Sequence, residues 1–120
     1  MIERRWLPPM LWAAFTLVLT SIPGADLPSA PVSGIDKAVH LALYGTLGFL
    51  WGRAVAHSPR PVRAGAGIVL AIALFAAADE LHQRFIPGRS MELLDWMADT
   101  LGAAAGVTIA LLIARRAEQA

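Results

Sequence analysis

Residues 62–85 read VRAGAGIVLAIALFAAADELHQRF, and this stretch decides the fold class of the chain. No charged or amide side chain occurs between Ala64 and Ala78, and the apolar run then ends in Asp79 and Glu80. A bilayer core about 30 Å thick needs about 20 helical residues. The stretch therefore predicts a transmembrane helix that carries acidic residues near one end.

The composition of the whole chain also favours a membrane protein. Hydrophobic residues make up 57% of the 120 residues and charged residues only 16%, which is too few to cover the surface of a soluble protein this short. The net charge of +1 argues against nucleic acid as a partner, because phosphate binding needs a clustered excess of basic residues. The chain has no cysteine, which excludes disulfides and zinc–thiolate sites.

Three further apolar stretches predict three more helices. They cover residues 6–22, 35–55 and 93–114, and together with 62–85 they predict one domain over residues 1–120, an all-α integral membrane bundle of four transmembrane helices. Cytoplasmic loops carry an excess of Lys and Arg, so both termini are expected in the cytoplasm. That orientation places seven basic residues inside and three outside: Arg4, Arg5, Arg53, Arg60, Arg63, Arg115 and Arg116 against Lys37, Arg84 and Arg89.

The first stretch has an alternative interpretation as a secretory signal peptide. Arg4 and Arg5 precede the hydrophobic run, and residues 27–30, which read LPSA, resemble a cleavage site. We expect a retained first helix instead, because the run is nearly long enough to span the bilayer and three further spans follow it.

Polar side chains from three predicted helices fall at one depth in the membrane. Asp36, His40 and Tyr44 are spaced four residues apart on one helix face, which puts His40 about 6 Å and Tyr44 about 12 Å below the outer surface. By the same rise, Asp79 and Asp99 also lie about 12 Å deep. An ionisable residue at the bilayer centre costs about 2.5–3.5 kcal/mol or more, so this gathering predicts a functional polar cluster. We assign ten residues to it: Asp36, Lys37, His40, Tyr44, Asp79, Glu80, Gln83, Arg89, Asp95 and Asp99.

The last predicted helix carries a packing surface on the same face as its acids. Asp95, Asp99, Gly102 and Gly106 are spaced i, i+4, i+7 and i+11, so carboxylates and small residues form one stripe. Such a stripe predicts a helix that is pressed against its neighbours.

The polar cluster also has a purely structural interpretation. Its side chains could form a hydrogen-bond network that only holds the helices together, with Lys37, Arg84 and Arg89 neutralising the acids. Five acids face these three bases, however, so some acids must be protonated, hydrated or bound to a cation. The excess favours a hydrated pocket that opens to the outside, with Gly88 in a left-handed turn and Arg89 at the mouth.

The spacing of the polar residues specifies no reaction. The HExxH pattern is absent, although Asp36 with His40 and Asp79 with His82 have spacings that metal ligands use. We expect His82 to point away from the face that carries Asp79 and Gln83. We therefore assign no catalytic residue, no metal and no cofactor.

Three motifs together resemble the VanZ-like family. They are Asp36-Lys37-x-x-His40-x-x-x-Tyr44, Asp79-Glu80-x-x-Gln83-x-Phe85-x-Pro87-Gly88-Arg89 and Asp95-x-x-x-Asp99-x-x-Gly102, and Ser21-Ile22-Pro23 resembles a further motif of that family. The resemblance covers nearly the whole chain and departs at Asp99, where the family usually carries Asn. It implies a small multi-pass protein of the bacterial cytoplasmic membrane, related to the cell envelope. The family's founding member is associated with resistance to the glycopeptide antibiotic teicoplanin.

The sequence is consistent with three functions. The favoured one is binding of a lipid, a lipid-linked cell-wall precursor or an amphiphile such as a glycopeptide antibiotic, with Lys37 and Arg89 meeting an anionic headgroup. The second is a membrane enzyme that acts on a lipid phosphate through Asp79, Glu80 and His40. The third is a structural membrane subunit. Membrane lipids are the expected partners in each case.

Overall fold

The computed structural model describes residues 3–26 and 34–120, which form a bundle of helices. The elements are α1 (Leu7–Thr20), α2 (Ile35–Val55), α3 (Pro61–Gln83) and α4 (Leu93–Gln119), with short 3-10 helices at Arg4–Trp6 and Gly24–Asp26. No strand occurs among the described residues. The predicted all-α class is therefore confirmed, while the possible cleavage site at residues 27–30 lies outside the described residues.

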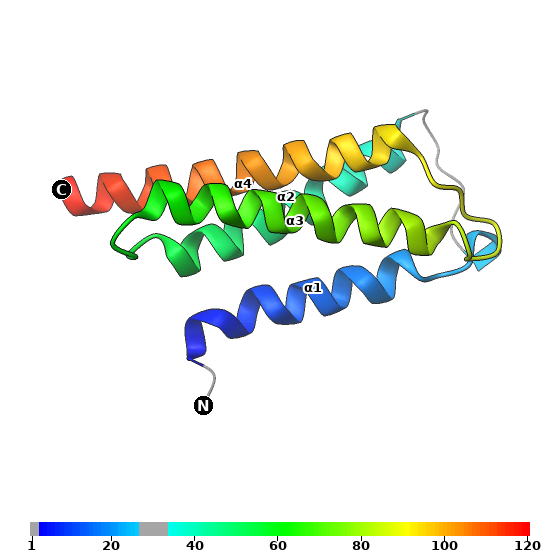
Figure 1. The fold of residues 1–120 in the computed structure, drawn as a ribbon, viewed down its shortest axis with the longest axis horizontal. Coiled ribbons are helices and arrows are strands. Elements are labelled where there is room, and N and C mark those ends of the chain that lie inside the picture. Colours follow the sequence, from blue (N-terminus) through cyan, green and yellow to red (C-terminus); the bar gives the residue numbers. More distant parts are fainter. Residues whose placement is uncertain (1–2, 27–33) are drawn as a thin grey trace.

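Successive helices run in opposite directions along the bundle (Figure 1). The N-terminus, the turn between α2 and α3, and the C-terminus lie at one end. The Gly24–Asp26 turn, the start of α2, the end of α3 and the start of α4 lie at the other end, which we call the polar end. α4 packs mainly on α2 and also on α3, and α1 makes the least extensive contacts of the four.

The helices agree with the predicted stretches to within two residues, except at the C-terminus of α4. The apolar run ends at residue 114, but α4 continues to Gln119. The added residues are Arg, Ala, Glu and Gln, which are polar or small but strong helix formers. The end of the apolar run therefore does not end the helix.

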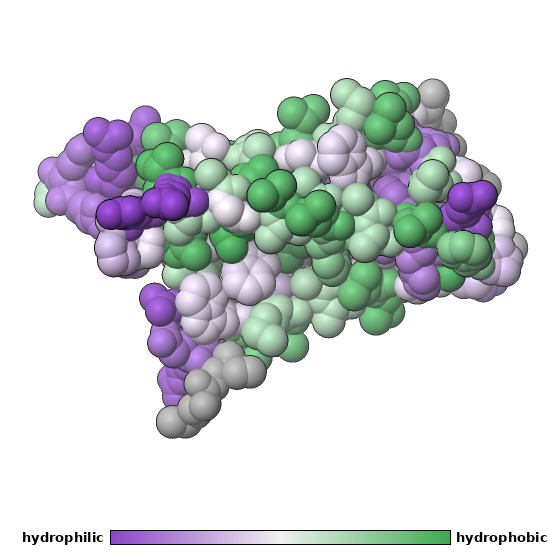
Figure 2. All heavy atoms as spheres, in the orientation of Figure 1, coloured by the Kyte–Doolittle hydropathy of each residue, from purple (hydrophilic) through white to green (hydrophobic). Residues whose placement is uncertain are grey.

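Within the described residues, two helices, α3 and α4, are long and apolar enough to cross a membrane. α1 has 14 residues, which amounts to about 21 Å of helix against a bilayer core of about 30 Å. On the face shown in Figure 2, hydrophobic side chains gather over the middle of the bundle and hydrophilic ones at its two ends. Large apolar side chains such as Val18, Leu74 and Leu101 are exposed on the helices. Such side chains are typical of a lipid-facing surface.

α2 and α4 are in backbone contact along the stripe that the sequence predicted. A Cβ atom built at Gly102 would lie 2.5 Å from the carbonyl oxygen of Leu41, and one at Gly48 would lie 2.3 Å from that of Ala103. No side chain fits at such distances, so close packing through small residues is confirmed. Gly106 continues the same contact farther along α4.

Two loops are joined at the polar end. The N–H of Gly24 donates to the carbonyl oxygen of Pro87 at 2.9 Å, and a Cβ atom at Gly24 would lie 2.1 Å from the carbonyl oxygen of Gly88. Gly88 has a φ of 74°, as predicted for a turn that needs a left-handed residue. The end of α1 is thereby fixed to the loop that leaves α3.

The middle of the bundle is filled by a buried core and two hydrogen-bonded indoles. Trp12 Nε1 of α1 donates to the carbonyl oxygen of Leu43, and Trp96 Nε1 of α4 donates to that of Ala73, each at 2.9 Å. The core side chains come from α2, α3 and α4: Leu43, Tyr44, Leu47, Ile72, Ala76 and Ala103. This core lies directly beneath the polar residues.

Candidate functional site

Asp79 joins three helices at the inner edge of the polar residues. Its Oδ1 accepts a hydrogen bond from the Thr20 hydroxyl of α1 at 2.9 Å, and its Oδ2 accepts one from the Tyr44 hydroxyl of α2 at 3.0 Å. All three side chains are buried. Because both carboxylate oxygens have a donor, Asp79 serves to hold α1, α2 and α3 together.

Thr20 is a site residue that the sequence analysis missed. Thr16 lies one turn earlier on the same face of α1 and is also buried. Two hydroxyls four residues apart within an apolar run are the signal that could have indicated a polar face on this helix.

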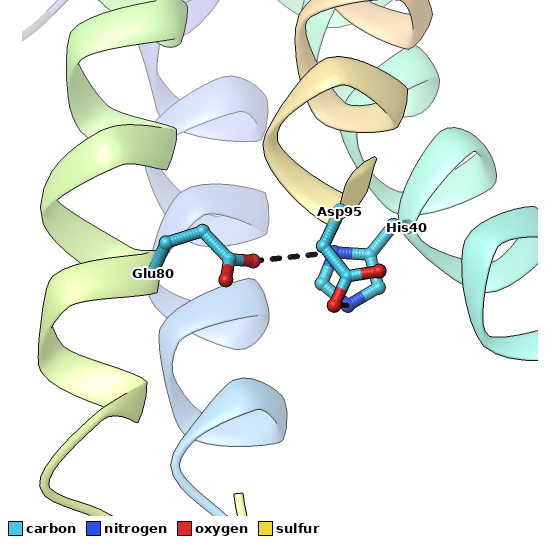
Figure 3. Close-up of side chains that lie close together, drawn as sticks. All are labelled: His40, Glu80 and Asp95. Carbon is cyan, nitrogen blue, oxygen red and sulfur yellow. Dashed lines mark ion pairs between the residues drawn. The ribbon is translucent and has the colours of Figure 1, made fainter. Parts of the chain in front are cut away.

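His40 of α2 and Asp99 of α4 form a buried pair. His40 Nδ1 lies 2.8 Å from Asp99 Oδ1, and the two residues are 7% and 0% exposed. Glu80 Oε1 of α3 lies 4.0 Å from His40 Nδ1, and Asp95 Oδ2 of α4 lies 3.8 Å from His40 Nε2 (Figure 3). We call His40, Glu80, Asp95 and Asp99 the acid–histidine cluster.

The acid–histidine cluster holds more acceptors than donors. Glu80 Oε2 accepts the backbone N–H of Glu92 at 3.2 Å. Glu80 Oε1 and Asp99 Oδ2, in contrast, are buried and have no hydrogen-bond partner within the described part of the chain. Each buried acceptor without a donor costs about 1–3 kcal/mol. A proton, a water molecule or a ligand therefore has to complete the cluster.

Lys37 closes the cluster on the side of the helix ends. Its ammonium group pairs with Asp36 at 2.7 Å, with Asp95 at 2.8 Å, and also with Glu92. The hydrogen bond and positive charge of Lys37 hold the pKa of Glu92, which precedes α4, below its usual range. Lys37 thus lies between the buried cluster and the exposed acids Asp36 and Glu92.

Glu92 is the second site residue that the sequence analysis missed. It lies three residues before Asp95, which is the spacing of side chains on one face, and this was the available signal. Because the helix was predicted to start at residue 93, Glu92 was assigned to the preceding loop. Helical spacing does not predict where the side chain of a loop residue lies.

Arg89 lies apart from the acid–histidine cluster. Its Nε donates to the carbonyl oxygen of Ile22 at 2.9 Å, and its Nη2 donates to that of Leu19 at 3.3 Å. These carbonyls lie at the C-terminus of α1, where the last helical C=O groups lack partners and attract a cation. Arg89 therefore binds the end of α1, and among the described residues it forms no ion pair with the acids of the predicted cluster.

The remaining predicted residues are placed as follows. Gln83 is buried near the end of α3, and its Nε2 has no hydrogen-bond partner among the residues described. His82 is exposed, as expected from its position on the opposite face. Arg84 is exposed too, so among the described residues Lys37 is the one base of the predicted three that pairs with the acids.

A family model described as VanZ/LLP1 matches residues 6–114, which is nearly the whole chain. The chain belongs to the VanZ/LLP1 family. The resemblance drawn from the sequence motifs is thereby confirmed. Neither a curated protein nor a solved structure matches this chain.

In this member of the VanZ/LLP1 family, the three motifs meet at the acid–histidine cluster. The first motif supplies His40, the second supplies Glu80, and the third supplies Asp95 and Asp99. Elsewhere at the polar end, Arg89 donates to Ile22, and Gly24, which follows Pro23, donates to Pro87. The motifs thus divide into one set that forms the cluster and another that fixes the end of α1.

Proposed function

We propose that this member of the VanZ/LLP1 family is a multi-pass protein of the bacterial cytoplasmic membrane that crosses it with all four helices. The antiparallel arrangement in Figure 1 supports an even number of spans, and the hydrophobic middle of the face shown in Figure 2 supports a lipid-facing surface there. Short α1 requires local thinning of the bilayer, which costs only a fraction of a kcal/mol per Å. Seven of the ten basic residues belong to segments at the end that holds both termini, which supports a cytoplasmic location for that end.

In this orientation the polar end faces the outside of the cell and binds a headgroup. The ligand is a lipid, a lipid-linked cell-wall precursor or another amphiphile, and its binding affects sensitivity to glycopeptide antibiotics such as teicoplanin. One observation carries the proposal: the buried acid–histidine cluster retains acceptors without donors, at Glu80 Oε1 and Asp99 Oδ2. Ionisable groups kept unsatisfied inside a membrane protein are typical of a site that a ligand completes. Lys37, at the edge of the cluster, would contact an anionic headgroup after leaving one of its three carboxylates.

The His40–Asp99 pair favours a second function, that of a membrane enzyme acting on a lipid phosphate. The 2.8 Å contact favours the tautomer with a proton on Nδ1, which leaves Nε2 free to accept a proton. Of the three residues predicted for this chemistry, Asp79 has both oxygens occupied by hydroxyl donors. Glu80 and His40 are then the groups available for proton transfer.

Substitution in cells that lack the protein tests the proposal. Glu80→Gln and Asp95→Asn should keep a normal amount of protein in the membrane fraction and lose protection against teicoplanin and other envelope-active agents. Glu118→Gln, at an exposed residue near the C-terminus, is the matched control and should protect like the wild type. Loss of the variants from the membrane fraction would instead support a structural subunit, and full protection by both variants would overturn the proposed binding function.

Purified protein separates binding from catalysis. The protein would be reconstituted in vesicles that contain phosphatidic acid, and release of inorganic phosphate would be measured. Release that disappears in His40→Gln supports the enzyme. Co-sedimentation of fluorescent phosphatidic acid with the protein, without release of phosphate, supports binding.

A further inference from the structure

We propose that His40, Glu80 and Asp95 bind one divalent metal ion of the Zn²⁺ or Mn²⁺ class. One ligand atom of each residue lies within 4.8 Å of those of the other two. The residues come from α2, α3 and α4 and are 7%, 3% and 6% exposed. Figure 3 shows the Glu80 carboxylate directed across the gap toward His40 and Asp95. A single ion at this place would connect three helices.

The free oxygen of Glu80 points to a ligand. Glu80 is almost completely buried, its Oε2 accepts the backbone N–H of Glu92, and its Oε1 has no hydrogen-bond partner among the described residues. This Oε1 lies 4.0 Å from His40 Nδ1, and the carboxylate is directed toward His40 and Asp95. A buried carboxylate oxygen is costly without a donor, and a bound cation would provide its missing partner.

Asp99 orients the imidazole ring of His40 so that its Nε2 can bind a metal ion. It lies 2.8 Å from His40 Nδ1, so Nδ1–H donates to it and the lone pair of Nε2 faces Asp95. Metal-binding histidines usually donate their other ring N–H to a carboxylate, which fixes the tautomer and raises the basicity of the ligand nitrogen. The cluster therefore contains three candidate ligands and one carboxylate that orients the histidine.

The spacing of the ligand atoms fits an ion better than a direct hydrogen bond. Asp95 Oδ2 and His40 Nε2 are 3.8 Å apart, which is too long for a hydrogen bond. Two ligands bound at about 2.1 Å to a tetrahedral ion are separated by about 3.4 Å. A contraction of about 0.4 Å would therefore bring this pair to coordination distance.

The donor set also selects the class of ion. An imidazole nitrogen with two carboxylates suits Zn²⁺ or Mn²⁺, whereas Mg²⁺ and Ca²⁺ prefer oxygen ligands alone. The neighbouring carboxylates of Asp36, Glu92 and Asp95 also lie close enough to hold an ion. They already surround the Lys37 ammonium group, so a cation there would have to displace it.

Direct titration tests this inference, which does not rest on the proposed headgroup binding. The full chain, purified in detergent and stripped with EDTA, would be titrated with ZnCl₂ and MnCl₂ by calorimetry, and bound metal would be counted by mass spectrometry. We expect one ion per chain, at least a tenfold loss of affinity in Glu80→Gln and His40→Gln, and no change in the controls His82→Gln and Glu118→Gln. Asp99→Asn should weaken binding less than Asp99→Ala, because the amide oxygen still accepts from Nδ1–H.

Several results would overturn the metal site. A wild-type protein that takes up neither ion near a stoichiometry of one would do so, as would Glu80→Gln that binds like the wild type. If Glu80→Gln does not fold, as judged by size-exclusion chromatography, X-ray absorption of the zinc-loaded wild type decides, and a spectrum without an imidazole ligand overturns the site. If the wild-type protein binds one ion but gives no protection against antibiotics, only the proposed headgroup binding has failed. If it protects but binds no ion, only the metal site has failed.

Discussion

Replacing Gly102 with alanine should separate α2 from α4 directly beneath the His40–Asp99 pair. The added Cβ atom would lie 2.5 Å from the carbonyl oxygen of Leu41, while ordinary contact begins at 3.4 Å, so the helices must move apart by about 0.9 Å. Leu41 follows His40 in α2. Along the His40–Asp99 contact, this movement would lengthen the 2.8 Å distance to about 3.7 Å, which is beyond hydrogen-bond range. Overpacking of this kind costs about 1–3 kcal/mol.

Thermal unfolding of the purified protein in detergent measures the loss, and the NMR signal of the His40 Nδ1 proton reports on the hydrogen bond. Gly67→Ala is the matched control, because a Cβ atom at Gly67 meets nothing within 4 Å and alanine favours helix more than glycine does. We expect Gly102→Ala to unfold at a lower temperature than the wild type and Gly67→Ala at the same or a higher one. If Gly102→Ala is as stable as Gly67→Ala and keeps the His40 proton signal, the argument from backbone contact is refuted.

Three further predictions concern the other contacts at the polar end. Tyr44→Phe should unfold at a lower temperature than the wild type, because it leaves the buried Oδ2 of Asp79 without its hydroxyl donor at about 1–3 kcal/mol. Equal unfolding temperatures would contradict this. Arg89→Ala should expose the end of α1 to limited proteolysis faster than Arg89→Lys, which keeps a cation at the helix C-terminus, and equal cleavage rates would count against the contact. Lys37→Met should raise the lowered pKa of Glu92 toward its ordinary value of about 4.3, as measured by NMR of its side-chain carboxyl. Since that pKa is lowered in the folded state, the Lys37–Glu92 pair stabilises the protein above the ordinary pKa and stops doing so as the pH falls through the lowered one; an unchanged pKa in the variant would argue against the pair.

The sequence contained enough information to place the helices along the chain. Apolar runs bounded by Pro61, Gly88 and similar residues predict where a helix starts and stops, because proline and glycine interrupt regular backbone. The five additional residues of α4 could not be predicted from hydrophobicity, since Arg115 and the residues after it stay helical without being apolar.

The sequence predicted how far along the helices the site residues lie, but only in part which side chains pair with one another. A constant rise per residue placed Tyr44, Asp79 and Asp99 at one depth, with His40 about one turn nearer the surface. Which donor meets which acceptor depends on the rotation and register of neighbouring helices, and contacts such as that of Gly48 with Ala103 set these in three dimensions. Spacing within one helix carries no information on that register.

Arg89 illustrates a second limit of the sequence. Its acceptors are backbone carbonyls of Ile22 and Leu19, and every residue has such a group. No residue type therefore marks the partner in advance. A carboxylate partner was the natural expectation for an arginine beside five acids, whereas its contacts are with two backbone carbonyls at the end of α1.

The contact between the two loops at the polar end constrains how this sequence can evolve. Gly24 and Gly88 are far apart along the chain, yet a side chain at Gly24 would fall on the backbone of Gly88. A side chain at Gly24 has to push the two loops apart, whereas a residue other than glycine at Gly88 is strained by the positive φ of that position. A change in either loop is therefore expected to alter the contact between them. Segments exchanged between relatives should then function together only when both loops come from the same parent.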